Sequence, residues 1–422
     1  MKRLDLRGAT KEELVQRLTK PAFDQVAVSE SVRARIQQTF GEDLSPAQLV
    51  DRIVQDVRLR GDSAVLEYTA KIDGVQLTAA GLEVSAEEKD RALAEVDPQL
   101  LGALKQAAEN VRRFHQEQKD HDRPWSSSRG NGSWLGQRRT PMDRAGLYVP
   151  GGTAAYPSSV LMTAIPAVVA GVQEVVMMVP PARDGSVNPL VLAAAVVAGV
   201  HRIFRIGGAQ AVAALAFGTA TVPAVDKIVG PGNLFVTLAK KAVYGYCDID
   251  MLAGPSEIMI VADASADPAF IAADMLSQAE HDELASSILV TDSEKLANQV
   301  VEELAVQLAT LPRSVTARTA LERQGMTLLV RDMSQATQCI NAAAPEHLEI
   351  MTVQPEALLP DIRHAGAIFL GAWSPEPLGD YFAGPSHVLP TGGTARYASV
   401  LNVDTFMKTT SIIAYTEQDL AA

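Results

Sequence analysis

The sequence has few cysteines and no long apolar run. Cys247 and Cys339 are its two cysteines among 422 residues. They form no CxxC motif, so neither a disulfide framework nor a thiolate metal site is expected, and two reduced cysteines are typical of a cytoplasmic protein. The longest apolar run, Leu190 to Val200, is much shorter than the roughly 20 residues of a membrane-spanning helix and predicts a buried helix. The N-terminal stretch also lacks the apolar segment of a secretory signal.

Basic residues are scarce relative to acidic ones. Lys and Arg number 37 against 50 Asp and Glu, which gives a formal net charge of −13. An acidic chain without a basic run is a poor candidate for binding nucleic acid or an anionic membrane, and we expect neither partner. Anionic cofactors are not excluded, because backbone amides can bind phosphate. The length favours more than one domain.

The spacing of apolar residues predicts an α/β fold. Residues 1 to about 140 have mainly helical spacing, with a loop or hairpin from Trp125 to Gly136. From Arg144 onward, short apolar runs alternate with Ala-rich helical stretches, which indicates parallel sheets with helices on both faces. The expected strands of the first series are Gly146–Val149, Glu174–Val179, Arg202–Ile206, Lys227–Val229 and Asp248–Met251, and those of the second are Glu257–Ala262, Ile288–Thr291, Thr327–Val330, His347–Met351 and Ala367–Leu370.

We therefore expect two doubly wound, Rossmann-like but incomplete α/β units with small helical N-terminal and C-terminal segments. A helical N-terminal segment is expected over residues 1–30. The first α/β unit, with the metal and catalytic residues, takes residues 31–143 plus 254–380, and the second, with Gly-rich loops, takes residues 144–253. Residues 381–422 form a C-terminal tail, whose end from Leu401 is expected to be partly helical.

Three Gly-rich loops follow expected strands. They are Tyr148 to Gly152, Ile206 to Gln210 and Gly230 to Asn233. Ligands of parallel sheets bind beyond the carboxyl ends of the strands, so these loops indicate a nucleotide-binding edge. None has the GxGxxG pattern, and each alone is equally explained as a tight turn. Asn233 has a second interpretation, as the N-cap of the next helix.

Gln278, His281 and Asp380 form a candidate metal cluster. Gln278 and His281 are three residues apart near the end of an expected helix and therefore share a face. A histidine with amide or carboxylate oxygens is acceptable to zinc, although glutamine is a rare ligand. The alternatives are a histidine that caps the helix end and, for Asp380, turn chemistry.

Glu346 and His347 place an acid beside a base at the start of an expected strand. Such a pair suits two separate proton transfers. Neighbours on a strand point to opposite faces, so both serve one pocket only if the backbone turns there. Otherwise they are a surface glutamate and a structural histidine. Ser256 and His387 lie in other polar loops, where His387 could hydrogen-bond a substrate. The alternative for these loops is turn chemistry, in which polar side chains bond to their own backbone.

Together these segments resemble the histidinol dehydrogenase family. The resemblance extends from the Phe114-His115 region to Ser411 and rests on the strings GLYVPGG, IGGAQAVAALAFGT, VGPGN, DMLAGPSE, DMLSQAEHD, APEHLE, GDYFAGPSHVLPT and TARYAS. It implies a zinc-dependent homodimer that oxidises L-histidinol to L-histidine, the last steps of histidine biosynthesis. The oxidation takes two NAD-dependent steps and passes through L-histidinaldehyde.

The resemblance also implies roles for individual residues. Gln278, His281 and Asp380 match the ligands of one Zn²⁺ per subunit, and Glu346 and His347 match the catalytic pair. His347 takes the hydroxyl proton and Glu346 activates water, roles that suit a base near neutral pH and a carboxylate. The NAD-contacting positions are Tyr148, Gln210 and Asn233, and the substrate-contacting positions are Ser256, Gln278, His281, His347, Asp380 and His387.

The tail departs from the family pattern. The family continues past the position of Ala422 with a glutamate that contacts substrate and a histidine that is the fourth zinc ligand, given across the dimer. No residue here matches either, and no histidine follows His387. We expect a truncated form of a dimer-crossing tail and weak binding of zinc and histidinol, which turnover equal to that of a longer chain would contradict. The alternative is a paralogue with altered or lost activity.

Three other functions stay open. A related zinc- and NAD-dependent dehydrogenase of another small polar alcohol would differ around Glu346, His387 and the tail, which contact the non-reacting end of the substrate. A zinc-dependent hydrolase would use Glu346 as its general base and would not bind NAD. An inactive zinc-binding homologue would keep the fold and form no NADH from histidinol.

Overall fold

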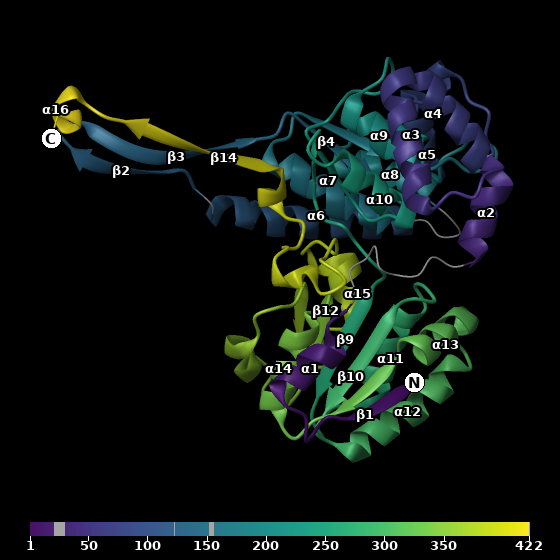
Figure 1. Ribbon diagram of the computed structural model, residues 1–422, viewed down its shortest axis with the longest axis vertical. Coiled ribbons are helices and arrows are strands. Elements are labelled where there is room, and N and C mark those ends of the chain that lie inside the picture. The colour runs from purple at the N-terminus through teal and green to yellow at the C-terminus, as the bar shows by residue number, and fades with distance from the viewer. Residues whose placement is uncertain (21–29, 122, 152–155, 422) are drawn as a thin grey trace. The chain divides into compact units, whose positions relative to one another are not determined.

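The computed structural model describes residues 1–20, 30–121, 123–151 and 156–421. The chain packs into two compact units. Unit 1 comprises Met1–Val28, Met251–Tyr381 and Leu389–Val400, and unit 2 comprises Ser29–Asp250, Phe382–Val388 and Leu401–Ala422. Each unit has its own parallel sheet covered by helices (Figure 1). None of the helices within the described ranges is long and apolar enough to cross a bilayer.

Unit 1 is built on a six-stranded sheet of order β1-β11-β10-β9-β12-β13, in which every pair is parallel. Its strands are β1 (Lys2–Asp5), β9 (Glu257–Ala262), β10 (Ser286–Thr291), β11 (Met326–Leu329), β12 (His347–Met351) and β13 (Ala367–Leu370). Its helices are α1 (Lys11–Leu18), α11 (Pro268–Ala279), α12 (Glu294–Leu308), α13 (Ser314–Arg323), α14 (Met333–Ala343) and the short α15 (Glu376–Leu378).

Strand β9 shows why this sheet is buried on both sides. Ile258 and Ile260 pack with residues of α11, α12 and α13, whereas Met259 and Val261 pack with residues of α1 and α14. Because side chains alternate along a strand, a strand covered on both faces has a continuous apolar sequence. This is the reason that the run from Glu257 to Ala262 shows no polar alternation.

Unit 2 contains a five-stranded parallel sheet of order β6-β5-β4-β7-β8. Its strands are β4 (Arg144–Tyr148), β5 (Glu174–Met178), β6 (Arg202–Phe204), β7 (Lys227–Val229) and β8 (Asp248–Ile249). The connecting helices are α7 (Pro157–Ala170), α8 (Pro189–Ala198), α9 (Gly208–Phe217) and α10 (Leu234–Val243). Helix α8 confirms that the longest apolar run is a buried helix.

The two sheets have the same strand order. If the five successive strands of each α/β series are numbered along the chain, both sheets read 3-2-1-4-5, with β1 added beside β11 in unit 1. This is the order of a doubly wound fold, and all ten expected strands are present within a few residues of their predicted ends. The prediction of two doubly wound α/β units is confirmed.

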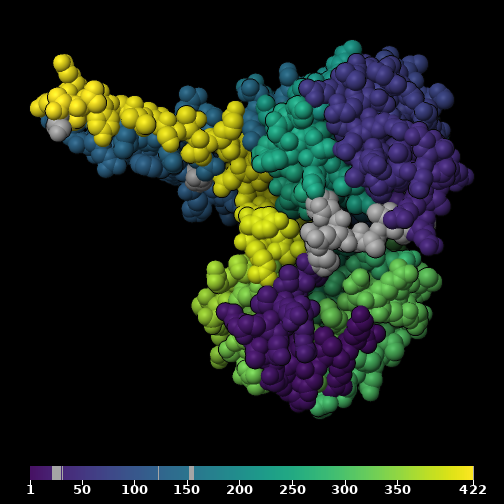
Figure 2. Space-filling view, viewed as in Figure 1, coloured from purple at the N-terminus to yellow at the C-terminus, as the bar shows by residue number. Residues whose placement is uncertain are grey.

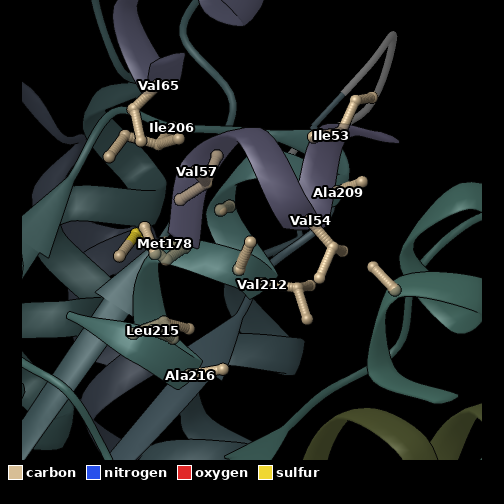
Figure 3. Close-up of a cluster of buried hydrophobic side chains, with 14 of the residues drawn as sticks. Ile53, Val54, Val57, Val65, Met178, Ile206, Ala209, Val212, Leu215 and Ala216 are labelled. Atoms are coloured by element: carbon tan, nitrogen blue, oxygen red, sulfur yellow. The ribbon is translucent and has the colours of Figure 1, made fainter. Parts of the chain in front are cut away.

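The five α-helices of the described chain that lie between α1 and β2 (Trp125–Gly130) belong to unit 2. They are α2 (Glu30–Phe40), α3 (Pro46–Arg60), α4 (Asp62–Tyr68), α5 (Ala86–Glu95) and α6 (Pro98–His121). Helix α3 starts at a capping box between Ser45 and Gln48. Its apolar stripe includes Ile53, Val54 and Val57, which lie against α9 in the cluster of Figure 3.

This packing corrects the expected domain ranges. Residues 31–143 were expected to join 254–380, but they lie with residues 144–250 in unit 2 because the stripe of α3 is buried on α9 and α10. The N-terminal segment is also not wholly helical, since Lys2–Asp5 forms the edge strand β1. This strand has four residues, and Leu4 is its one apolar residue, so its sequence is too short to show the alternation of a strand.

Replacing Ile53 with Ala should destabilise unit 2. Ile53 is 1% exposed, and its removal leaves a cavity between α3 and α9. The expected loss is about 2–4 kcal/mol of unfolding free energy. Urea denaturation checks this value, with the exposed Leu59 on the same helix changed to Ala as the control. Equal losses in both variants would contradict the assignment of Ile53 to the core.

A three-stranded antiparallel sheet of order β14-β3-β2 completes unit 2. Strands β2 (Trp125–Gly130) and β3 (Ser133–Pro141) form a hairpin whose turn residues Asn131 and Gly132 have φ angles of 44° and 89°. Asn-Gly favours such a turn, so the interpretation as a loop or hairpin is confirmed as a hairpin. The sheet extends from the rest of unit 2 (Figure 1).

The end of the chain from Leu401 contains one strand and two short helical segments. Val403–Phe406 forms a 3-10 turn, Met407–Ala414 is β14, which pairs with β3, and Glu417–Leu420 forms the short helix α16. The end of the chain lies along the hairpin (Figure 2). The expectation of a partly helical end agrees with these two helical segments, while residues 407–414 form a strand. The segment is rich in β-branched side chains, which favour a strand once a partner edge is available.

Candidate active site

The chemistry-bearing side chains of unit 1 lie at the amino ends of its strands. His347 is the first residue of β12 and Glu257 the first residue of β9, and the two strands are neighbours. Gln278 lies in the last turn of α11. In a parallel α/β unit the helices run back to the amino edge of the sheet, so the end of a helix meets the starts of the strands there. The usual ligand edge of this fold is the opposite one.

The backbone turns at Glu346 and His347, as a shared pocket requires. Ala344 has a left-handed φ of 50° at the end of α14, and Pro345 follows it before β12 begins. Both side chains are buried, and His347 Nδ1 lies 3.7 Å from Glu346 Oε2. The alternative of a surface glutamate is therefore wrong.

Hydrogen bonds orient the imidazole of His347. Its Nδ1 lies 3.0 Å from the Glu257 carbonyl oxygen, and its Nε2 lies 3.2 Å from Asp380 Oδ1. A carbonyl oxygen only accepts, so Nδ1 donates and Nε2 is left for proton exchange. Burial by itself lowers the pKa of His347, but the carboxylates of Glu346 and Asp380 outweigh it and raise this pKa to about 10.

Glu346 is held by the backbone of Glu257. Its Oε2 accepts a hydrogen bond from the Glu257 N–H at 2.7 Å. Burial raises the pKa of Glu346 to about 8, and the positive charge of His347 opposes this shift. The Glu257 carboxylate, also buried, forms an ion pair with Lys20 at 2.8 Å and accepts from the Gly392 N–H at 2.8 Å. Lys20 and Glu257 were missed by the sequence interpretation because they are far from Glu346 in the chain.

Asp380 belongs to a group of potential metal ligands. The nearest ligand atoms of His347, Glu376 and Asp380 all lie within 4.8 Å of one another. Burial raises the pKa of Glu376 to about 7, and the nearby Asp380 carboxylate adds to this effect. Glu376 was not predicted, although it lies four residues before Asp380 at the start of α15, a spacing that places both on one side of a helical turn.

Gln278 and His281 differ in their surroundings. Gln278 is 1% exposed, and its Oε1 has no hydrogen-bond partner in the described part of the chain. The preceding Ser277 donates to Glu376 Oε2 at 2.9 Å, so this end of α11 adjoins the Glu376–Asp380 turn. His281 is exposed just beyond the helix and does not belong to the group of His347, Glu376 and Asp380. Its role as a ligand stays a prediction.

The buried oxygen of Gln278 shows that the residues present fit a cation. An unpartnered buried carbonyl oxygen is costly, and coordination to a cation would relieve that cost. Imidazole nitrogen with amide and carboxylate oxygens is an acceptable donor set for zinc. The same donors also suit other divalent first-row metals, so the chemistry of the set favours a divalent cation in general.

The two predicted substrate contacts lie in different units. Ser256 immediately precedes Glu257, and its carbonyl oxygen accepts from the Ser286 N–H at 3.0 Å, so it lies at the amino edge of the unit 1 sheet. His387 belongs to unit 2, between Ser386 and Val388. Ser386 is buried, and its hydroxyl donates to the Met162 carbonyl oxygen at 3.1 Å. The role of His387 at the catalytic pair stays a prediction.

The predicted NAD-contacting residues lie at the carboxyl edge of the unit 2 sheet. Tyr148 ends β4, Gln210 is in the first turn of α9 after β6, and Asn233 follows β7. The Tyr148 hydroxyl oxygen accepts from the Gly208 N–H at 3.1 Å. Asn233 Oδ1 accepts from Phe235 N–H at 3.0 Å, which confirms its interpretation as an N-cap. Gly152 of the first loop lies outside the described residues.

Comparison with known proteins gives matches to one family. The family model "Histidinol dehydrogenase" matches residues 37–422. The chain is 54% identical over 383 residues to histidinol dehydrogenase of Heliobacterium mobile, covering 90% of this chain and 89% of that protein. It is 53% identical over 368 residues to the enzyme of Bacillus subtilis (strain 168), covering 87% and 85%.

A solved structure is similar over the whole length. The crystal structure of histidinol dehydrogenase from Elizabethkingia anophelis has 34% sequence identity and a TM-score of 0.90, and the match covers 100% of this chain and 92% of that one. The buried Glu-His pair at the start of β12 thus lies in a chain that matches this family in sequence and in structure. The chain belongs to the histidinol dehydrogenase family, whose members are NAD-dependent oxidoreductases.

Proposed function

We propose that this chain oxidises L-histidinol to L-histidine through L-histidinaldehyde, with NAD⁺ as the acceptor in both steps. The observation that carries the proposal is the buried pair of Glu346 and His347, which offers a carboxylate and an imidazole at one edge of the unit 1 sheet. Two consecutive oxidations at one site need two proton transfers, from an alcohol and from water. The pair supplies one base for each.

Gln278, His281 and Asp380 are the residues proposed to hold one Zn²⁺ per subunit, and Glu376 is a further carboxylate beside Asp380. When bound, the ion acts as a template that orients the amino and imidazole nitrogens of the substrate, while the nicotinamide ring accepts hydride. Gln278 contributes an oxygen that no other described group uses.

His347 is proposed as the base of the first oxidation. Its Nδ1–H is held by the Glu257 carbonyl oxygen, which leaves Nε2 to take the hydroxyl proton while the carbon-bound hydrogen leaves as hydride. Asp380, 3.2 Å from Nε2, stabilises the imidazolium that forms. A carboxylate shared with a cation attracts this proton less strongly, which would lower the pKa of His347 towards neutrality.

Glu346 is proposed as the base of the second oxidation. Its carboxylate would remove a proton from the water that attacks the aldehyde carbon, after which a second hydride leaves. The raised pKa makes this carboxylate a stronger base than a solvent-exposed glutamate. Burial also keeps bulk water away from the reactive aldehyde between the two steps.

The remaining predicted residues complete the proposal. Tyr148, Gln210 and Asn233 contact NAD⁺ at the carboxyl edge of the unit 2 sheet, where the helix starts favour phosphate. Ser256 and His387 contact the substrate. The enzyme is proposed to act as a homodimer in the cytoplasm, on a small-molecule substrate.

Formation of NADH from L-histidinol tests the proposed function. The expected stoichiometry is two NADH per histidinol consumed, with a rate that increases when Zn²⁺ is added to metal-depleted protein. Exhaustive conversion of a limiting amount of histidinol, followed at 340 nm, measures it. Absence of NADH at any metal concentration, in protein shown to be folded, would overturn the proposal.

Changing Gln278 to Ala is expected to weaken zinc binding by about tenfold or more, as loss of a metal-site group usually does. The physical reason is the loss of a buried oxygen that has no other described partner. Competition with a chromophoric chelator measures the dissociation constant. The exposed Gln324 changed to Ala is the matched control in the same unit. Equal zinc affinities in the two variants would show that Gln278 is not a ligand.

A further inference from the structure

The side-chain amide of Gln210 has one hydrogen-bond partner among the described residues. Gln210 is fully buried in the first turn of α9, and its Nε2 donates to Asp73 Oδ2 at 3.3 Å. Its Oε1 is buried without a hydrogen-bond partner in the described ranges of the chain. A buried amide oxygen without a donor is an unfavourable state, which a ligand N–H or O–H would relieve.

Asp73 lies directly against the Gly-rich loop that leads into α9. It is the last residue of the short helical segment Thr69–Asp73, and Gly74 follows with a left-handed φ of 73°. A Cβ atom built on Gly207 would come within 3.3 Å of Asp73 Oδ1. The carboxylate therefore packs against the same loop that carries Gln210, although the two residues are separated by more than a hundred positions.

The chemistry of Asp73 determines which end of the amide faces it. An ionised carboxylate has only acceptors, whereas the amide has an NH₂ end and an oxygen end. The NH₂ end must face Asp73, because two oxygens would repel each other. The oxygen then lies over Gly208, where a Cβ atom would be only 2.8 Å away from it. Glycine at this position leaves room for the oxygen in that orientation.

We propose that Asp73 is a positioning residue for the cofactor, which holds the amide of Gln210 so that its oxygen accepts a hydrogen bond from NAD⁺. The donor on NAD⁺ is a ribose hydroxyl or the carboxamide NH₂, which share the required chemistry. This inference rests on the proposed contact between Gln210 and NAD⁺. Asp73 itself acts through Gln210 and need not touch the cofactor.

The charge state of Asp73 gives a second line of support. Burial raises the pKa of Asp73 to about 6, and the positive charge of Arg35 partly opposes this. Tyr148 also lies close to Asp73, and burial raises its own pKa to about 12. Between pH 5 and 8 only Asp73 among these groups changes its charge. When Asp73 is protonated, its O–H can donate a hydrogen bond to the amide oxygen of Gln210. The amide of Gln210 can then turn its oxygen towards Asp73 instead of its NH₂ group.

The test compares NAD⁺ binding in Asp73→Asn, Gln210→Ala and the double variant at pH 8. Asp73→Asn keeps the shape of the side chain but allows the amide of Gln210 to flip. Its NAD⁺ dissociation constant is expected to rise by about 3- to 10-fold, the size of one lost hydrogen bond. The kcat at saturating NAD⁺ and the KM for histidinol should stay unchanged. Asp90→Asn, an exposed site on α5, is the control.

Because Asp73 acts through Gln210, Asp73→Asn should have no further effect in the Gln210→Ala background. If the double variant bound NAD⁺ more weakly than Gln210→Ala, the inference would be overturned. It would also be overturned if Asp73→Asn bound NAD⁺ normally while Gln210→Ala bound it weakly. Those results leave the proposed contact of Gln210 intact. Normal affinity in Gln210→Ala would instead refute that contact and the inference together.

The wild-type protein provides a measurement that does not depend on any variant. Its NAD⁺ dissociation constant, measured by calorimetry, should rise as the pH falls through about 6, because Asp73 is then protonated. The constant of Asp73→Asn should not change over this range. A wild-type constant that is independent of pH between 5 and 8 would contradict the role of the Asp73 carboxylate.

Discussion

Replacement of His347 by Asn should nearly abolish the first oxidation, with kcat for histidinol falling about 10²- to 10⁴-fold. Asparagine can still donate from its amide to the Glu257 carbonyl oxygen, so the local structure is retained. It has no group that takes a proton in place of Nε2. The loss should therefore lie in kcat, measured as NADH formation at saturating NAD⁺ and histidinol.

Two controls distinguish loss of the base from other effects of the His347→Asn substitution. His364→Asn, in the same unit but outside the cluster of His347, Glu376 and Asp380, should retain wild-type kcat. Zinc content should be measured in His347→Asn, because His347 lies within 4.8 Å of the predicted ligand Asp380. A His347→Asn protein that binds zinc and turns over histidinol at the wild-type rate would refute the assignment of His347 as the base.

The variant Glu346→Gln should separate the two oxidations. Hydride transfer from histidinol should continue, whereas attack of water on the aldehyde should slow by about 10²- to 10⁴-fold. The NADH formed per histidinol in a single turnover should fall from two towards one. Rapid-mixing absorbance with excess enzyme measures this ratio, and Glu356→Gln, at an exposed site, is the control. Two NADH at the normal rate would exclude Glu346 as the base for water.

The pH dependence of the second oxidation follows from the same residue. The base form of Glu346 is the carboxylate, and its pKa in the folded protein is about 8. The rate should therefore rise with pH and level off above about 8. The folded state holds this proton more tightly than the unfolded chain, whose glutamate has a pKa of about 4.3. The free energy of unfolding consequently falls as the pH rises from about 4.3 to about 8. Glu346→Gln should remove this decrease in stability.

The sequence predicted the strands of both parallel sheets with the exception of β1. Continuous apolar runs such as Glu257 to Ala262 predicted buried strands, and the Ala-rich stretches between them predicted helices, because burial on both faces leaves a strong local pattern. Lys2–Asp5 was missed as a strand. An exposed edge strand of four residues has no such pattern and depends on the partner strand β11.

The sequence did not indicate which helices pack on which sheet. The stripe of α3 predicted an amphipathic helix but did not indicate which sheet it covers, since any apolar surface would satisfy it. Residues 31–143 were consequently assigned to the wrong unit. Likewise, the strand β14 exists because the edge of β3 is available to it, which the tail's own sequence does not reveal.

The sequence by itself determined the family and the order of the α/β elements, because both depend on local strings and local periodicity. It also identified Glu346, His347, Gln278 and Asp380 as candidates. Only the tertiary structure decided that the proposed catalytic residues lie at the amino edge of the unit 1 sheet, with Glu257 and Glu376 beside them. Only the tertiary structure placed Asp73 on Gln210 as well. Both results are contacts between distant parts of the chain, which depend on packing and leave no local pattern.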